Sequence, residues 1–254
     1  MNLMMNSTMN LMKISMKSSK NKIAIIITAA GSSTRIGGGI KKEYLPFKNG
    51  TVLSTCVQTF INSCKNQFSI TDFIVTCPPN GILECQKALS FTSQQENDNF
   101  KNISQVFQIV EGDTTRQKSV YNAMCAIRNN PQIVLIHDGA RPFVSQGIIL
   151  EGIEAAQIFG ASVPGLTPTD TQKQIDKDGF ITKHLQRASL VSVQTPQCFD
   201  FPKLLNAHKK AHLEENEYTD DTEIWGKYYG KVKVTHGESQ NIKITYPKDL
   251  ESLK

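Results

Sequence analysis

The sequence contains no long apolar segment. None of its 254 residues lies in a run of 18 apolar residues, the length that a membrane-spanning helix needs, so we expect no span. The run IAIIITAA at 23–30 and the lysines before it fit a signal peptide in part, but the polar segment ahead of the run is too long for one. We therefore expect residues 1–21 to be a disordered extension and order to begin near Lys22.

Metal-binding cysteine patterns are missing as well. The six cysteines stand at positions 56, 64, 77, 85, 125 and 198, without a C-x-x-C pair and without a histidine cluster beside them. This spacing gives a zinc site little support. It is typical of reduced thiols, and we expect a cytoplasmic protein.

Two common nucleotide-binding motifs are absent. The chain has neither G-x-x-x-x-G-K-[ST] nor G-x-G-x-x-G, which disfavours an ordinary P-loop or dinucleotide fold. Apolar residues make up 39% and charged residues 20%, ordinary values for a globular protein. The formal charge is +5 with scattered basic residues. Such a balance requires no nucleic-acid surface and suits the binding of small anions.

What the sequence does contain is an alternation of β-branched runs and helical patterns. A helix is expected where TVLSTCVQTFINSCKN places apolar residues at helical spacing, and another from Thr114, where Thr114 and Gln117 can form a capping box. The alternation predicts an α/β fold, a Rossmann-like and mostly parallel twisted sheet with helices on both faces, in a single domain over 22–254. The expected strands are 23–28, 72–77, 106–111, 132–138, 161–165, 191–195, 231–236 and 242–245.

Two segments depart from this alternation. Residues 90–104 are polar and indicate a surface excursion. Residues 168–184 indicate a hairpin around Asp178-Gly179 with too few apolar residues for a core of its own. We expect an arm over about 168–192 that projects and packs on another surface, such as that of a second subunit.

The stretch IIITAAGSSTRIGGGIKKEY, residues 25–44, suits a polyphosphate site. A loop at the carboxyl end of a strand exposes backbone N–H groups to an anion, and Gly31 permits close approach. Arg35 can chelate phosphate oxygens and Lys42 can supply a compact positive charge. A basic surface loop without a ligand is the other interpretation that the loop alone allows.

A carboxylate ends the buried run VLIHD. Asp138 there is suited to Mg²⁺, which binds through one or two carboxylates together with phosphate oxygens and water. Arg141, three residues on, can anchor phosphate or the loop itself. A helix-capping role for Asp138 is the alternative, and His137 is expected to be structural.

Several motifs in order resemble one family. AAGSSTR followed by KKEYLPF resembles the nucleotidyltransferase signature of sugar- and polyol-phosphate pyrophosphorylases. The further segments GDTTRQKSV, HDGARPFV, LQRASLVSVQTPQCF, YTDD and NIKIT make the chain similar to the 2-C-methyl-D-erythritol 4-phosphate cytidylyltransferase family over roughly residues 22–254. The resemblance implies transfer of CMP from CTP to a polyol phosphate with release of pyrophosphate, with Mg²⁺ or another divalent cation, in a homodimer formed through the arm.

The resemblance also implies residue roles. Arg35, Lys42 and Lys243 would be catalytic, holding the triphosphate and stabilising the transition state, and Asp138 would bind the metal. Residues implied in substrate binding are Ala29, Ala30, Gly31, Gly112, Asp113, Ser119, Arg141, Thr171, Arg187, Thr195 and Thr219. Among these, Thr171 and Arg187 would reach from the arm into the neighbouring subunit's site. Asp220 and Asp221 stay open between metal binding and a helix N-terminus.

The chain departs from the family pattern at two places. Lys41 stands where the family usually has proline, and Glu43 where glutamine is common.

Two rival functions stay open. A ribitol 5-phosphate cytidylyltransferase of the same fold shares the glycine-rich start and NIKIT. The rival from another class is a non-catalytic nucleotide-binding protein. An inactive relative would be expected to have lost at least one of the functional residues, but all four are present: Arg35, Lys42, Asp138 and Lys243.

Overall fold

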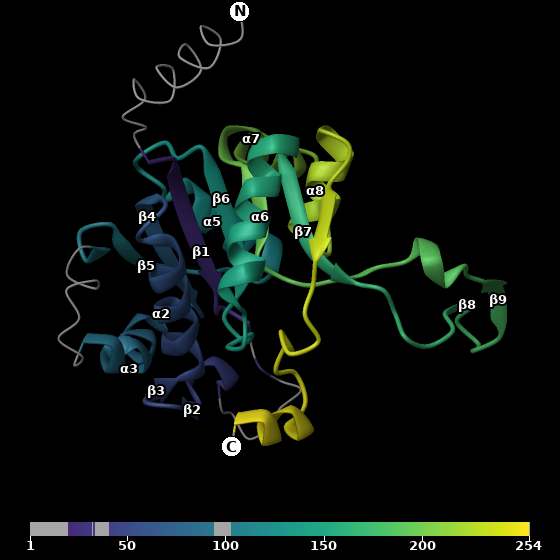
Figure 1. The fold of residues 1–254 in the computed structure, drawn as a ribbon, viewed down its shortest axis with the longest axis horizontal. Coiled ribbons are helices and arrows are strands. Elements are labelled where there is room, and N and C mark those ends of the chain that lie inside the picture. The colour runs from purple at the N-terminus through teal and green to yellow at the C-terminus, as the bar shows by residue number, and fades with distance from the viewer. Residues whose placement is uncertain (1–19, 32, 34–40, 94–102, 254) are drawn as a thin grey trace, which may run out of the picture.

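A central sheet with helices on both faces organises the chain (Figure 1). The computed structural model describes residues 20–31, 33, 41–93 and 103–253. The sheet has the strand order β10-β7-β11-β6-β1-β4-β5, with β12 paired to β7. Its strands are β1 (Lys22–Thr28), β4 (Ser69–Cys77), β5 (Phe107–Glu111), β6 (Ile133–Asp138), β7 (Ala161–Leu166), β10 (Ser192–Val193), β11 (Gln197–Asp200) and β12 (Lys233–His236).

Most neighbouring strands of this sheet are parallel. The pairs β1–β4, β1–β6, β4–β5 and β7–β12 are parallel, whereas β11 runs antiparallel between β6 and β7, and β10 runs antiparallel to β7. The α/β class and the mostly parallel sheet predicted from the sequence are therefore confirmed. Parallel strands place their carboxyl ends at one edge, where ligands of such folds bind.

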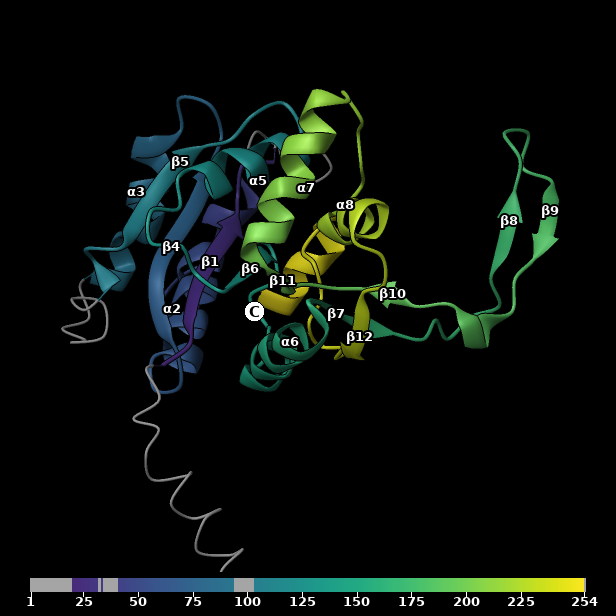
Figure 2. The same cartoon turned by 90° about the horizontal axis from the view of Figure 1, so that it is seen from above.

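Alternate residues of β1 face two different helical layers (Figure 2). Ile25 and Ile27 pack with residues of α2 and α6, and Ile26 packs with residues of α5 and α7. All three are fully buried, which explains why β1 is apolar at successive positions and not at alternate ones. The helices are α2 (Val52–Cys64), α3 (Ile82–Ser93), α5 (Arg116–Cys125), α6 (Gln146–Phe159), α7 (Phe201–Leu213) and α8 (Asp221–Tyr228).

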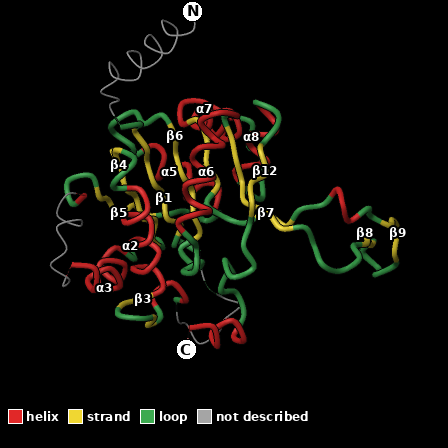
Figure 3. Tube along the Cα trace, viewed as in Figure 1, coloured by secondary structure: helices red, strands yellow, loops and turns green. Residues whose placement is uncertain are grey.

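Short elements complete the chain. Strands β2 (Pro46–Phe47) and β3 (Gly50–Thr51) form a small hairpin, and β8 (Lys173–Ile175) pairs antiparallel with β9 (Ile181–His184). The 3₁₀ turns are η1 (Lys42–Tyr44), η2 (Arg187–Ser189) and η3 (Pro247–Leu253). The antiparallel pairing of β8 and β9 confirms the hairpin predicted at 168–184. This hairpin stands well away from the sheet in the two views of Figure 2 and Figure 3. No helix among the described residues is long and apolar enough to cross a membrane.

Two local predictions differ from the structure. Residues 242–245 form no strand: Ile244 donates its N–H to the Ala140 carbonyl, but its side chain packs with Phe47 and Val52 in a small separate cluster. The helix predicted from Thr114 begins one residue later, with Thr115 as N-cap. The Asp113 carboxylate accepts hydrogen bonds from the N–H and hydroxyl of Thr114, which leaves Thr115 to cap the helix.

The predicted polar excursion at 90–104 is wrong at its start. Helix α3 runs on to Ser93, beyond the point where the sequence turns polar. Residues 94–102 lie outside the described residues, as do residues 1–19 of the predicted N-terminal extension. Strand β10 covers only Ser192–Val193 of the predicted 191–195, and strand β11 was not predicted, because four residues give too little pattern to detect.

Candidate active site

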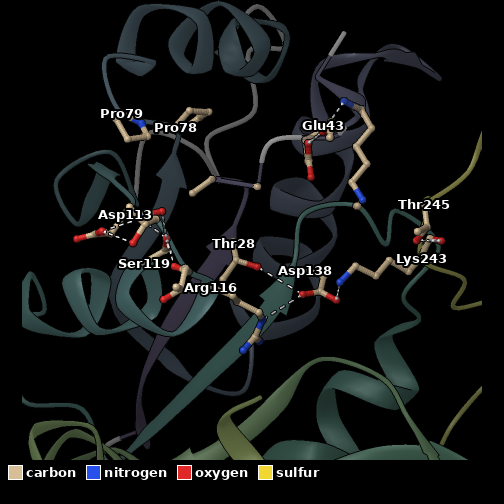
Figure 4. Close-up of a pocket in the computed structure, with 17 residues that line it drawn as sticks. Thr28, Glu43, Pro78, Pro79, Asp113, Arg116, Ser119, Asp138, Lys243 and Thr245 are labelled. Atoms are coloured by element: carbon tan, nitrogen blue, oxygen red, sulfur yellow. Dashed lines mark hydrogen bonds and ion pairs between the residues drawn. The ribbon is translucent and has the colours of Figure 1, made fainter. Parts of the chain in front are cut away.

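Loops that follow four strands surround a cavity of about 590 Å³ at the carboxyl edge of the sheet (Figure 4). The loops after β1, β4, β5 and β6 line it, together with residues 243 and 245 of the C-terminal segment. Figure 4 shows Asp113 and Ser119 on one side, Lys243 and Thr245 on the other, and Thr28 and Asp138 between them. The predicted site residues that line the cavity are Ala30, Gly31, Lys42, Asp113, Ser119, Asp138 and Lys243.

Asp138 is the centre of a charge cluster. Its Oδ2 lies 2.9 Å from Lys243 Nζ and 3.3 Å from Arg141 Nε, and its Oδ1 lies 3.7 Å from Arg116 Nε. Burial raises the pKa of such a carboxyl, but here Lys243, Arg116 and Arg141 together hold the pKa of Asp138 well below its usual range. These three cations therefore favour the ionised form of Asp138.

Arg116 joins this cluster to a second buried carboxylate. Its Nη1 donates to Asp221 Oδ2 at 2.7 Å, and Asp221 is fully buried. The other oxygen of Asp221 is 3.0 Å from His208 Nε2. Burial raises the pKa of Asp221, but Arg116 and His208 lower it to about 2. Asp220, by contrast, caps helix α8 by accepting the Glu223 N–H.

The sequence prediction overlooked Arg116 as a site residue. Within the segment GDTTRQKSV, Asp113 and Ser119 are predicted to bind substrate, whereas no role is predicted for the arginine. The signal that could have identified it is position, because Arg116 is the first residue of a helix that follows the carboxyl end of a strand. A cation there lies at the sheet edge where ligands of such folds bind.

Lys42 lies in the cavity wall with its ammonium group held in place. Its Nζ donates to the Ile244 carbonyl at 2.7 Å, and the residue is 8% exposed. This contact joins the loop after β1 to the C-terminal segment that carries Lys243. Arg35, the third predicted catalytic cation, lies outside the described residues.

The two positions that depart from the family pattern contact the loop ends. Lys41 Nζ donates to the Gly31 carbonyl and lies 3.5 Å from Glu43 Oε2. Glu43 accepts a hydrogen bond from the Ser33 hydroxyl, which in turn accepts the Lys42 N–H. Burial lowers the pKa of Lys41, against the opposing effect of Glu43. Lysine and glutamate at these positions therefore hold residues 31 and 33 close to residues 41–43.

Two predicted substrate-binding residues lie behind the cavity wall. Ala29 is buried and donates its N–H to Thr76 Oγ1 at 3.0 Å, so that this N–H already has a partner. Gly112 packs so closely that a Cβ there would lie 2.4 Å from Ala30 Cβ and 2.7 Å from Ser119 Oγ. Ala29 and Gly112 thus shape the wall that Ala30 and Ser119 present.

Asp113 and Ser119 form a hydrogen-bonded turn at one end of the cavity. Ser119 Oγ accepts the Asp113 N–H at 2.9 Å and lies 2.8 Å from the Thr115 carbonyl, to which it donates. Hydrogen bonds from the backbone and side chain of Thr114 lower the pKa of Asp113. The turn therefore holds an exposed, ionised carboxylate next to a buried hydroxyl, a pattern that can pair with polar groups of a ligand.

A buried hydrogen-bond chain supports Asp138 from behind. The Asp138 N–H donates to Thr195 Oγ1, which lies 3.0 Å from His137 Nδ1, and His137 Nε2 lies 3.1 Å from the Arg141 carbonyl. Burial lowers the pKa of His137 to about 4, so the imidazole is neutral, accepting at Nδ1 and donating at Nε2. His137 is structural, as expected. Thr195 and Arg141 support Asp138 and do not line the cavity.

The remaining predicted residues lie away from the cavity of their own chain. Arg187 donates from Nη1 to the Thr169 carbonyl within the arm, and Thr171 lies in the same exposed arm. Thr219 precedes helix α8, where Glu223 accepts hydrogen bonds from its N–H and hydroxyl. None of the three lines the cavity.

The side chains of the cavity suit a metal ion that takes only some of its coordinating oxygens from the protein. Among the described residues, no group of three or more His, Cys, Asp or Glu side chains lies close enough to hold an ion alone. Asp138 is an ionised carboxylate in the cavity wall, with Thr28 Oγ1 3.5 Å from its Oδ1. One carboxylate with phosphate oxygens and water is a coordination that Mg²⁺ accepts in nucleotide sites.

Comparisons with known proteins agree with this geometry. A family model described as 2-C-methyl-D-erythritol 4-phosphate cytidylyltransferase matches residues 23–253. Proteins of that name from Clostridium novyi and Clostridium perfringens are 39% and 37% identical, covering 91% and 90% of this chain and 94% and 96% of theirs.

Solved structures give the same result. The chain superposes on a 4-diphosphocytidyl-2C-methyl-D-erythritol synthase from Anaerococcus prevotii with a TM-score of 0.76 at 28% identity, covering 92% of this chain and 94% of the other. The corresponding values for a 2-C-methyl-D-erythritol 4-phosphate cytidylyltransferase from Thermus thermophilus are 0.66, 27%, 92% and 96%. The similarity to each of these structures therefore covers 92% of the chain.

Proposed function

Because the chain belongs to the 2-C-methyl-D-erythritol 4-phosphate cytidylyltransferase family, we propose that the cavity at the carboxyl edge of its sheet is where it binds CTP. The protein is a nucleotidyltransferase that transfers CMP from CTP to 2-C-methyl-D-erythritol 4-phosphate. The products are 4-diphosphocytidyl-2-C-methyl-D-erythritol and pyrophosphate, in the synthesis of isoprenoid precursors.

The chemistry requires positioning and charge neutralisation more than a protein nucleophile. A phosphate oxygen of the acceptor attacks the α-phosphorus of CTP, the P–O bond to the β-phosphate breaks, and pyrophosphate leaves with the electron pair. The nucleophile is already an anion, so no serine or histidine has to be activated. The protein has to hold two anions in line, because their close approach and alignment lower the barrier to the transfer of CMP.

The cations of the cavity fit this task. Lys42 and Lys243 would contact the triphosphate and stabilise the charge that develops on the leaving pyrophosphate, with Arg35 as the third predicted group. We add Arg116, which lines the cavity and was absent from the sequence prediction. Each preorganised donor of this kind is worth roughly 3 kcal/mol of barrier.

The opposite end of the cavity fits the cytidine. Asp113 and Ser119 offer a carboxylate and a hydroxyl held by the turn at the start of α5. Ala30 and Gly31 line the wall between this turn and the cations, with Ala29 and Gly112 behind them. A base and a ribose are recognised by directional hydrogen bonds of this kind.

A divalent cation, such as Mg²⁺, would be held by Asp138. When bound, the ion neutralises phosphate charge and fixes the orientation of the phosphate oxygens. Lys243 Nζ lies 2.9 Å from the same carboxylate, which would place its ammonium group beside the phosphates. Arg141 and Thr195 would keep the carboxylate in place.

The arm would bring the acceptor. Thr171 and Arg187 lie on the arm, outside the cavity of their own chain, and the hairpin exposes Ile175, Phe180 and Ile181. We propose a homodimer in which these apolar side chains pack on the partner and Thr171 and Arg187 contact the polyol phosphate there. Thr219 would face the same acceptor.

The observation that carries the proposal is the convergence of Lys42, Lys243, Arg116 and Asp138 on one cavity in a chain of this family. Release of pyrophosphate from CTP should require 2-C-methyl-D-erythritol 4-phosphate and fail with ribitol 5-phosphate. Lys42→Ala should reduce turnover about 100-fold, whereas Lys203→Ala, which removes an exposed lysine of α7, should not. Equal turnover with both acceptors would contradict the assignment.

The two rival functions lack support of this kind. The family model and the relatives named above carry the methylerythritol name, not the ribitol one. Against a protein that only binds nucleotide stands the presence of Lys42, Asp138 and Lys243 together in the cavity, since an inactive relative would be expected to have lost at least one of them. Turnover in the assay above separates both rivals from the proposed reaction.

A further inference from the structure

The guanidinium group of Arg116 is held by two carboxylates from different elements. Its Nη1 is 2.7 Å from Asp221 Oδ2, and its Nε is 3.7 Å from Asp138 Oδ1. Asp138 ends strand β6 and lines the cavity, whereas Asp221 opens helix α8, is fully buried and does not line it. The closer contact therefore fixes Arg116 from behind, and the longer one leaves it beside the metal-binding carboxylate (Figure 4).

Asp221 is itself fixed on its other side. Its Oδ1 is 3.0 Å from Nε2 of His208, a residue of α7 that is 1% exposed and stacks its ring near that of Tyr121 on α5. Both carboxylate oxygens thus have a partner, so the carboxylate cannot turn without losing one of them. Helices α7 and α8 in this way determine where Arg116 lies.

Stability alone does not account for this arrangement. A buried ion pair often contributes no more than apolar side chains of equal volume, because both charges lose their water. What the pair does provide is a defined position for the arginine. If Asp221 were neutral, the nearest carboxylate for Arg116 would be Asp138, whose Oδ1 the guanidinium group would then approach and occupy.

We infer that Asp221 is a positioning residue for CMP transfer, which keeps Arg116 directed at the phosphates and prevents it from closing on Asp138. The inference rests on the proposed function of the cavity. Loss of the Asp221 charge reduces the affinity for CTP and increases the divalent-cation concentration that CTP binding requires. It leaves the KM for the acceptor unchanged.

The test is a double-mutant cycle on the full-length protein, read by calorimetric titration with CTP at several Mg²⁺ concentrations and by steady-state kinetics. Asp221→Asn should weaken CTP binding about tenfold and Arg116→Ala about 30-fold, while the double variant resembles Arg116→Ala. Asp200→Asn is the matched control, since Asp200 caps α7, where asparagine serves as well, pairs only at the surface with Lys203, and does not line the cavity. This control should bind CTP as the wild type does.

A merely structural role predicts other results. In that case Asp221→Asn lowers the melting temperature but not the CTP affinity of the folded fraction, or its effect multiplies with that of Arg116→Ala, and either result overturns the inference. If Asp221→Asn does not fold, His208→Leu takes its place in the cycle with a smaller loss, about threefold, again absent in the Arg116→Ala background. The proposed function fails separately, when the wild type binds CTP but does not transfer CMP to the acceptor.

Discussion

The cavity and the arm of this protein are built by opposite means. In the cavity, Asp138 is 6% exposed and is surrounded by Arg141 from its own loop and by Lys243 and Arg116 from two other segments. In the arm, every residue of strands β8 and β9 is exposed, and the hairpin stands apart from the sheet (Figure 2). One region is held by a network of buried contacts and the other by a short strand pair.

The difference indicates how the two halves of the reaction are divided. A set of charges fixed within one chain can bind the nucleotide without help. A hairpin that exposes Phe180 at 70% and Ile175 at 61% has no core of its own and gains stability by packing on another surface. We therefore expect cavity substitutions to affect CTP and arm substitutions to affect the acceptor.

The largest effect is expected in the cavity. Lys243→Ala should reduce kcat/KM for CTP about 100-fold, because it removes a positive charge next to the site of transfer. Asp138 keeps Arg116 and Arg141 as partners, so the variant should remain folded. Steady-state kinetics with Lys203→Ala as control measure this, and a loss below about threefold would remove Lys243 from the mechanism.

A pH effect on stability should come from the buried support of the cavity. Burial lowers the pKa of His137 from 6.5 to about 4, so the unfolded chain binds a proton that the folded protein does not bind between these pH values. The contribution is therefore complete above about pH 6.5 and decreases as the pH falls toward 4. The free energy of unfolding should be about 2 kcal/mol lower at pH 5 than at pH 7 from this group.

Urea unfolding at the two pH values checks this, with His137→Gln as the comparison. The glutamine cannot titrate, so the pH difference should shrink by about the same 2 kcal/mol. The lowered pKa values of Asp138 and Asp221 act in the other range, since their contribution is lost only below about pH 4. An unchanged pH difference in His137→Gln would contradict the assignment.

The arm should respond to a charge placed among its apolar side chains. Phe180→Asp should shift the proposed dimer toward monomers and raise the KM for the acceptor about tenfold, because a carboxylate cannot be buried in an apolar interface without cost. Light scattering after size exclusion gives the mass. Phe159→Asp is the matched control, a phenylalanine that is 55% exposed on α6. Equal shifts in both variants would argue against an interface at the arm.

The features that could be predicted from the sequence are those with a local sequence signal. Ile23 to Ile27 are an unbroken apolar run, and Asp138 ends another apolar strand, so the sheet edge and its carboxylate could be predicted. Lys243, predicted from the family resemblance, lines the cavity although its predicted strand is absent, because the segment that carries it contacts Ala140 and Lys42.

The residues and elements that the sequence prediction missed depend on long-range contacts. Arg116 acquires its role from Asp221, which is 105 residues away, and no local pattern encodes that pair. Strand β11 has four residues and is defined by its neighbours β6 and β7, as are the burial of Thr195 and its hydrogen bond to Asp138. Such contacts exist only once the sheet is assembled, which is why composition and periodicity do not reveal them.

The most direct test of the division between cavity and arm is a calorimetric titration with CTP and Mg²⁺, without acceptor, of the wild type, Arg187→Ala and Lys243→Ala. We predict the same Kd within about twofold for the wild type and Arg187→Ala, and a Kd at least about tenfold higher for Lys243→Ala. CTP binding that weakens in Arg187→Ala as much as in Lys243→Ala would contradict the account.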